Sequence, residues 1–158
     1  MAEFAYNPIQ LVEPNQNIIL DTIIPCNKGY VFHRDQSGIV ILRGIVNCPN
    51  ACFARYQVTF NGNIALPDGA EVGPISIAIA IDGEPVQTSR AIVTPADTAE
   101  DPPTAANFFN VTSTAIINVP KGCCFTVAVE NTSGPAETGG VAQEILVQNA
   151  NLTVARIA

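Results

Sequence analysis

The sequence predicts an all-β protein whose antiparallel strands pack as a closed sandwich. Apolar and polar residues alternate over long stretches, and this is the period of a half-buried strand. Gly, Pro and Asn cluster between these stretches as they do in tight turns, and no stretch has a convincing helical period. The last alternating run reaches the end of the chain. A strand there must dock in a sheet or leave an aggregation-prone edge.

The first sixteen residues, 1–16, are predicted to form an irregular, extended N-terminal arm. Pro8 and Pro14 exclude a regular helix, and Asn and Gln dominate the end of the segment. Apolar side chains recur along it more often than in a disordered tail. We therefore expect the arm to lie against a surface, which is either a partner particle or its own domain. The candidate contact residues are Phe4, Tyr6, Ile9, Leu11 and Val12.

The strands of the body follow from the same alternation. In 52–66, Tyr56 begins a run of apolar residues on one face with polar residues between them. In 75–81 four isoleucines share one face, and the other face is small rather than charged, so we expect both to be covered. Asp82-Gly83 is a hairpin signal. The predicted strands are 17–24, 30–33, 39–46, 52–66, 75–81, 86–93, 106–119, 123–131 and 144–157.

This number and spacing of strands favours a jelly-roll β-sandwich of eight to ten strands over residues 17–158. The loop 94–105 holds three prolines and three acidic residues, and we expect it to be exposed and mobile.

Composition indicates one domain of 158 residues with a large apolar content. Only 13% of residues are charged and 47% are hydrophobic. The excess of apolar residues indicates either an oligomer interface or a well-packed sandwich rich in Ala and Val. The net charge is −7 and the basic residues are scattered along the sequence, so nucleic-acid binding is not expected. No apolar run could span a membrane, and the start of the chain does not read as a signal peptide. We therefore expect synthesis in the cytoplasm.

The five cysteines do not predict a secreted disulfide framework, because their number is odd and no signal peptide is apparent. Cys48 and Cys52 are a candidate disulfide across their loop. Their spacing is not C-x-x-C and no second ligand pair accompanies them, so a metal site is not expected. The cysteines are otherwise expected to be small buried hydrophobes. They are Cys26, Cys48, Cys52, Cys123 and Cys124.

Catalytic chemistry is not expected. The single histidine, His33, lies on a predicted strand where its neighbours Arg34 and Asp35 point to the opposite face. We expect a structural histidine bonded to a loop carbonyl. No G-x-S-x-G motif is present. The acidic cluster 97–101 lacks the spacing of a calcium loop, so a solvated loop is expected and no cofactor is predicted.

Three segments carry a resemblance to a known family. They are the hairpin IDGEPV at 81–86, the strand pair NVTSTAIINVPKGCCFTVAVENTS at 110–133 and the ending VQNANLTVARIA at 147–158. Over residues 52–158 this pattern resembles the tumour-necrosis-factor-like jelly roll, in the bacterial and phage branch whose members cap collagen-like spore-surface filaments. Cys123-Cys124 departs from the pattern, because an acidic or polar residue commonly follows the glycine there.

The resemblance implies a tight homotrimer in which one sheet of each subunit packs around a threefold axis. Carried onto this sequence, it implies Tyr56, Phe125 and Val154 as interface residues, with ordinary intrachain core as the alternative. The expected collagen-like repeat does not precede the domain, and this favours phage head-decoration or head-fibre proteins.

The leading hypothesis is therefore a non-enzymatic virion structural protein on the outside of a bacteriophage particle. It would be a capsid-decoration or head-fibre trimer, held by residues 1–16 to the major capsid protein or another virion protein. A receptor- or glycan-binding tip is the alternative, although the loops contain no Trp and almost no Tyr. A hydrolase that uses His33 is the third hypothesis.

Overall fold

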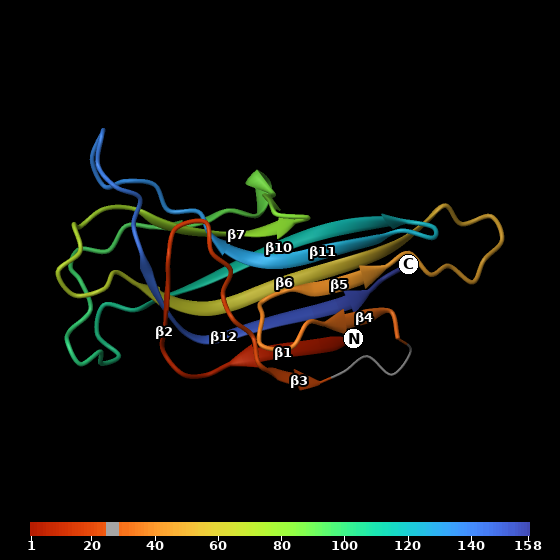
Figure 1. The fold of residues 1–158 in the computed structure, drawn as a ribbon, viewed down its shortest axis with the longest axis horizontal. Helices are drawn as coiled ribbons and strands as arrows, with labels where there is room; N and C mark the ends of the chain where they lie inside the picture. Colours follow the sequence, from red (N-terminus) through yellow and green to blue (C-terminus); the bar gives the residue numbers. More distant parts are fainter. Residues whose placement is uncertain (25–28) are drawn as a thin grey trace.

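The structure is a computed structural model that describes residues 1–24 and 29–158, and it is a sandwich of two antiparallel sheets (Figure 1). Cys26 lies outside the described residues. Sheet A has the order β10 (Phe109–Pro120), β6 (Phe53–Ala65), β12 (Ile145–Arg156), β1 (Ala2–Tyr6) and β3 (Thr22–Ile24), with β2 (Gln10–Val12) paired to β12. Sheet B has the order β4 (Val31–His33), β5 (Val40–Arg43), β11 (Cys124–Asn131), β7 (Ile75–Ile81) and β8 (Glu84–Pro85), with β9 (Ala91–Val93) paired to β7.

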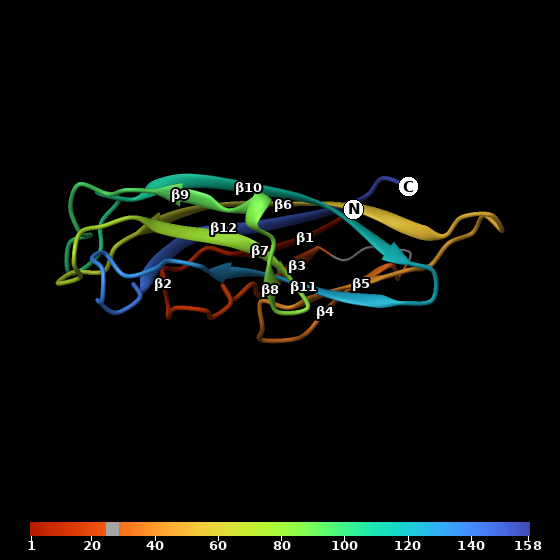
Figure 2. The ribbon, with the colours of Figure 1, turned by 90° about the horizontal axis from the view of Figure 1, so that it is seen from above.

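The chain passes repeatedly from one sheet to the other, which is the connectivity of a jelly roll. It leaves sheet A between β6 and β7, returns before β10, and crosses again on each side of β11. Figure 2 shows the two layers edge-on, and the predicted all-β jelly roll is confirmed. The described residues form twelve strands, because residues 1–16 supply two and the predicted strand 86–93 is replaced by two short ones, β8 and β9. A 3-10 turn, η1 (Gln87–Ser89), separates those two.

The core lies between the sheets and is built by the predicted alternation. Along β6, residues 54, 56, 58 and 60 are fully buried, whereas the residues between them are exposed or half-buried. Along β7 the isoleucines face the core, and the opposite face of small residues is buried as well. Among the described residues, no helix is long and apolar enough to cross a bilayer.

Residues 1–16 are part of the sandwich, so the prediction of a separate arm needs correction. β1 lies between β12 and β3, with Phe4 opposite Leu152, and Phe4 is only 1% exposed. Val12 is buried, Tyr6 and Ile9 are half-buried, and Leu11 is 55% exposed. Pro8 and Pro14 exclude a helix, but they do not prevent short strands between them. The alternative of a segment of its own domain therefore describes the structure.

The two ends of the sandwich are formed by different loops (Figure 1). At one end lie the loop 44–52 between β5 and β6 and the turn 120–124 between β10 and β11. We call this end the thiol pole. At the opposite end lie the loops 66–74, 94–108 and 132–144, which we call the acidic pole.

Candidate assembly surfaces

The outer face of sheet A is almost free of charge over β10, β6 and β12, and the Glu3 carboxylate of β1 borders it by accepting from the Asn151 amide. Over β10, β6 and β12 its side chains are amides, hydroxyls, one alanine and one exposed isoleucine, Ile116, with charged residues only toward the thiol pole. We call this surface the neutral face. Its members are Gln57, Thr59, Asn61, Asn63, Asn110, Thr112, Thr114, Ile116, Asn118, Asn151, Thr153 and Ala155.

The polar side chains of the neutral face bond to one another across the strands. The Asn61 amide donates to the Thr112 hydroxyl at 3.1 Å, and the Asn110 amide donates to Asn61 Oδ1 at 3.0 Å. The Thr114 hydroxyl donates to the Thr59 hydroxyl at 3.3 Å. Because these groups already have hydrogen-bond partners within the face, covering them with a second surface breaks fewer of their hydrogen bonds to water.

Strand β10 forms one edge of sheet A. It pairs with β6 along all 12 of its residues. On its other side the Ser113 hydroxyl donates to the Ser89 carbonyl of η1. A long edge strand invites pairing or cover by another chain. The neutral face and this edge therefore form a continuous candidate interface.

The residues that the resemblance implied as interface are placed differently. Tyr56 and Val154 are fully buried within the subunit, so neither side chain can contact a second copy, and this part of the prediction is corrected. Both point inward from strands of sheet A, and an apolar inward residue cannot be distinguished from an interface residue by sequence. Phe125 is half-buried and packs against the core, and its role in an interface stays a prediction.

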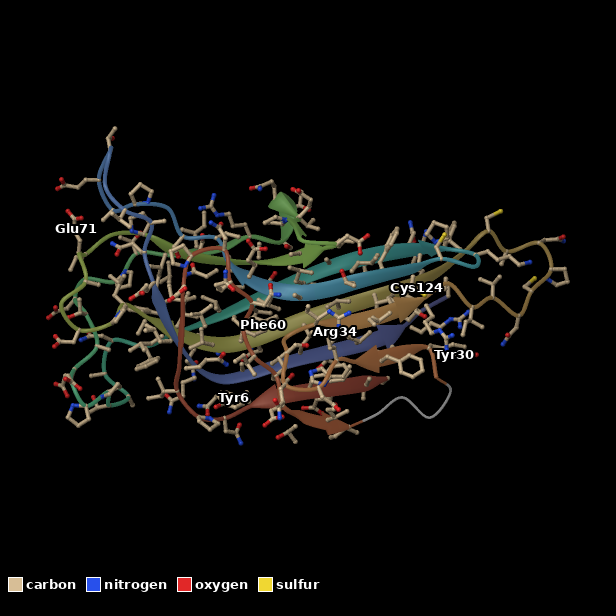
Figure 3. All side chains as sticks on the ribbon, viewed as in Figure 1. Tyr6, Tyr30, Arg34, Phe60, Glu71 and Cys124 are labelled. Atoms are coloured by element: carbon tan, nitrogen blue, oxygen red, sulfur yellow. The ribbon has the colours of Figure 1, made fainter. Side chains whose placement is uncertain are left out.

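Charge is segregated along the molecule, although the basic residues are scattered in the sequence. The loops of the acidic pole contain no Lys or Arg, and their acidic residues are Asp68, Glu71, Asp97, Glu100, Asp101, Glu137 and Glu144. Toward the thiol pole the strands bring together Arg43, Arg55, Lys121 and Arg156. Figure 3 shows Glu71 at one end and Cys124 with Tyr30 at the other.

The arginines at the thiol pole lie over aromatic rings. The Arg156 guanidinium carbon is 4.2 Å from the centroid of the Tyr30 ring. Arg43 lies over Phe32 and Arg55 over Phe53, each at 5.1 Å. These contacts hold the guanidinium groups in place.

Four cysteines, Cys48, Cys52, Cys123 and Cys124, are free and exposed at the thiol pole. The prediction of buried cysteines is therefore wrong for these four, and the candidate Cys48–Cys52 disulfide is not formed. The Ala51 N–H closes a turn onto the Cys48 carbonyl at 3.1 Å, and both thiols face solvent. No group of three or more metal-ligating side chains is found among the described residues.

His33 bonds to a loop carbonyl, as predicted. Its Nε2 lies 2.8 Å from the Ser37 carbonyl oxygen, which can only accept, so Nε2 carries the proton. Its ring stacks on Phe4 with centroids 5.3 Å apart. The other ring nitrogen is buried and has no hydrogen-bond partner.

Two shallow grooves lie on the described surface. One follows β2 and is lined by residues such as Leu11 and Ile19. The other lies at the acidic pole beside Val141 and Glu71. Neither is lined by an aromatic side chain, and rings of that kind are the usual apolar walls of small-molecule sites.

Known proteins resemble this chain in structure but not in sequence. No family profile and no curated sequence matches it. The globular domain of the zebrafish complement 1qA protein superposes with a TM-score of 0.51 at 10% identity, covering 96% of this chain and 94% of that chain. The Eiger TNF of S. frugiperda superposes with a TM-score of 0.53 at 12% identity, covering 100% and 92%. The fold is the TNF-like jelly roll.

Both likenesses extend over almost the whole of each chain, so the TNF-like jelly roll includes the N-terminal strands as well as residues 52–158. At these identities the likeness shows the fold alone. The sugar-binding C-terminal domain of EclA superposes with a TM-score of only 0.41 at 12% identity, covering 95% of this chain and 79% of that chain, and it carries no argument.

Proposed function

We propose that this protein is a non-enzymatic structural subunit that forms a homotrimer through its neutral face and decorates a bacteriophage capsid. The neutral face carries the proposal. The chain has 14 acidic residues and a net charge of −7, yet the outer surface of β10, β6 and β12 is left almost uncharged. Charged residues are depleted at the centre of protein interfaces, because burying them is costly.

The trimer and the virion setting rest on the resemblance described above, and the fold is consistent with the trimer. In the TNF-like jelly roll of this chain, β12 lies at the centre of sheet A between β6 and β1. A trimer in which this sheet faces the threefold axis would cover the neutral face. It would also cover the edge strand β10.

Attachment to the particle cannot use residues 1–16 as a detached arm, because β1 is an inner strand. Of the five predicted contact residues, Leu11 is the exposed one. We therefore place the contact with the major capsid protein, or with another virion protein, at the β2 segment. Ile19 is also exposed and lines the same groove as Leu11.

The native mass of the protein under reducing conditions tests the proposal. We expect three times the chain mass of 16.6 kDa. Ile116→Lys places a charge on the neutral face and should give a folded monomer. Ile92→Lys is the matched control, because Ile92 is 60% exposed against 54% for Ile116 and lies on sheet B. A monomeric wild type, or equal effects of the two variants, would overturn the proposed interface.

A receptor- or glycan-binding tip is the alternative function, with its ligand among the loops of the acidic pole. The groove at that pole lacks an aromatic platform for a sugar ring. We therefore rank this function second. Specific hits on a glycan array that are lost on substitution within 132–144 would reverse that order.

A further inference from the structure

The four exposed thiols at the thiol pole are unusual for cysteines outside a disulfide. Free cysteine is one of the most buried residue types, because its side chain behaves as a small hydrophobe. Here Cys48 and Cys52 lie in one loop, and Cys123 and Cys124 lie in the adjoining turn. All four are solvent-exposed in the isolated chain. Core packing therefore does not explain them.

The two segments that carry the thiols are fastened together by their backbones. The Gly44 N–H donates to the Cys123 carbonyl at 2.8 Å, and the Lys121 N–H donates to the Cys52 carbonyl at 2.9 Å. A Cβ on Gly44 would lie 1.8 Å from the Pro120 oxygen, so the approach is too close for any other residue. The backbones of the two segments that carry the thiols are thus held in a fixed relative position.

The thiols are directed away from the interior of their own subunit. Cys124 begins β11, in which Phe125 packs against the core, so the alternation turns Cys124 to the outer face of sheet B. Cys48 and Cys52 lie in the loop that leads to β6 of sheet A. Exposed thiols on two separate segments of one pole are accessible for bonds to neighbouring molecules.

The charge at this pole favours anionic disulfide reagents. The segments 44–56 and 119–125 contain Arg55 and Lys121 and no acidic residue. Arg43 lies opposite Cys124 in the register of β5 and β11. Glutathione disulfide carries a net negative charge near neutral pH, so this local field raises its concentration at the thiols.

We propose that the thiol pole is a covalent cross-linking site that joins copies of this chain by disulfide bonds. A thiol of loop 44–52 in one subunit pairs with Cys123 or Cys124 of its neighbour. The proposal rests on the proposed homotrimer. In a cyclic assembly each subunit uses two different surfaces, so a loop-to-turn bond repeated at each of the three contacts closes a covalent ring.

The chemistry is thiol–disulfide exchange with glutathione disulfide as the oxidant. A cysteine thiolate attacks the reagent and forms a mixed disulfide, releasing one glutathione thiolate, which takes up a proton. The neighbour's thiolate then attacks the protein sulfur of that mixed disulfide. The bond between the two chains forms, and a second glutathione thiol is released. Two protein thiols are oxidised and one reagent disulfide is reduced.

The experiment treats the assembled full-length protein with glutathione disulfide and then denatures it without reductant. We expect a three-chain covalent species whose mass is lower by two hydrogens per bond. Peptide mapping should identify disulfide-linked peptides in which Cys48 or Cys52 is bonded to Cys123 or Cys124. The double variants Cys48→Ser/Cys52→Ser and Cys123→Ser/Cys124→Ser should each lose the species. Assembled together, the two variants should regain linked pairs, because each supplies the partner that the other lacks. Cys26→Ser is the control and should retain the cross-link.

The readouts separate this inference from the proposed function. A trimer under reducing conditions that gives only glutathione adducts, or only Cys48–Cys52 bonds within a chain, would overturn the cross-link and leave the trimer standing. A cross-link that requires Cys26 would also overturn it. A monomer under reducing conditions would refute the trimer itself, and the ring of bonds with it.

Discussion

The hydroxyl of Tyr56 donates a hydrogen bond of 2.6 Å to the backbone carbonyl of Arg43. Tyr56 belongs to β6 of sheet A and Arg43 to β5 of sheet B, so this bond joins the two sheets near the thiol pole. Tyr56 has no solvent exposure. Its ring therefore fills the core while its hydroxyl satisfies a carbonyl of the facing layer.

Substitution of Tyr56 by Phe removes this link and keeps the ring. We expect a loss of roughly 1–2 kcal/mol in the free energy of unfolding, because the partly buried carbonyl of Arg43 loses this donor. Urea denaturation followed by circular dichroism measures the change in the free energy of unfolding. Tyr6→Phe is the control, since Tyr6 is half-buried and its hydroxyl makes no hydrogen bond recorded among the described residues. Equal losses for both variants would show that the hydroxyl of Tyr56 contributes nothing specific.

The buried hydroxyl of Ser89 takes the place of a missing strand partner beside β7. It accepts from the Ile79 N–H at 2.9 Å and donates to the Val86 carbonyl at 2.7 Å, in the gap between β8 and β9. Ser89→Ala should cost about 1–3 kcal/mol, because the Ile79 N–H is left without an acceptor. Amide hydrogen exchange should become faster at Ile79. Unchanged protection there would mean that another acceptor replaces the hydroxyl.

The backbone at Gly44 lies directly against the Pro120 carbonyl at the thiol pole. Gly44→Ala must displace the Pro120 carbonyl, and we expect a loss of about 2–3 kcal/mol in stability. Gly134→Ala is a matched control, because a Cβ there would meet nothing within 4 Å and its φ is not in the left-handed region. Its effect should stay within about 0.5 kcal/mol. Thermal unfolding of the two variants side by side distinguishes the local clash from a general cost of replacing glycine.

Glu130 is only 7% exposed, and burial, together with the nearby charge of Glu84, raises the pKa of its carboxyl above the ordinary value of 4.5. The folded state therefore binds this proton more tightly than the unfolded state. The stabilising contribution is present below the unfolded pKa and is lost as the pH rises through the folded pKa. Glu130→Gln should raise the melting temperature relative to wild type at pH 8 and leave it unchanged near pH 3. A gain that is the same at both pH values would contradict a titration effect.

The strands of the sandwich were predictable because alternation is a local property. The burial of Tyr56 and Ile77 follows from the alternation of apolar and polar residues along their strands. β1 was missed because it is a strand of only five residues close to Pro8. The strand with which it pairs is also distant in sequence, since Ala2 lies opposite Val154. Pairing at such a distance leaves no local signal.

The candidate site was less predictable than the fold. Residues such as Arg43 and Arg156 are far apart in the sequence, and only the strand topology brings both toward the thiol pole. The exposure of Cys123 and Cys124 could have been inferred from the Pro-Lys-Gly turn before them, which places both at the tip of a hairpin. The neutral face could also have been found, since every exposed residue from Asn110 to Asn118 is uncharged.

The pairing of Ala2 with Val154 has a consequence for synthesis of the protein. β1 is synthesised before its sheet A neighbour β12, and nearly the whole fold lies between these two strands in sequence. The sheet therefore cannot close before β12 has been synthesised. Contacts between residues so far apart in sequence also form slowly. The nascent chain must keep Phe4 and the strands that follow away from other nascent chains until β12 has emerged, which makes expression yield sensitive to translation rate and to chaperones that hold unfolded chains.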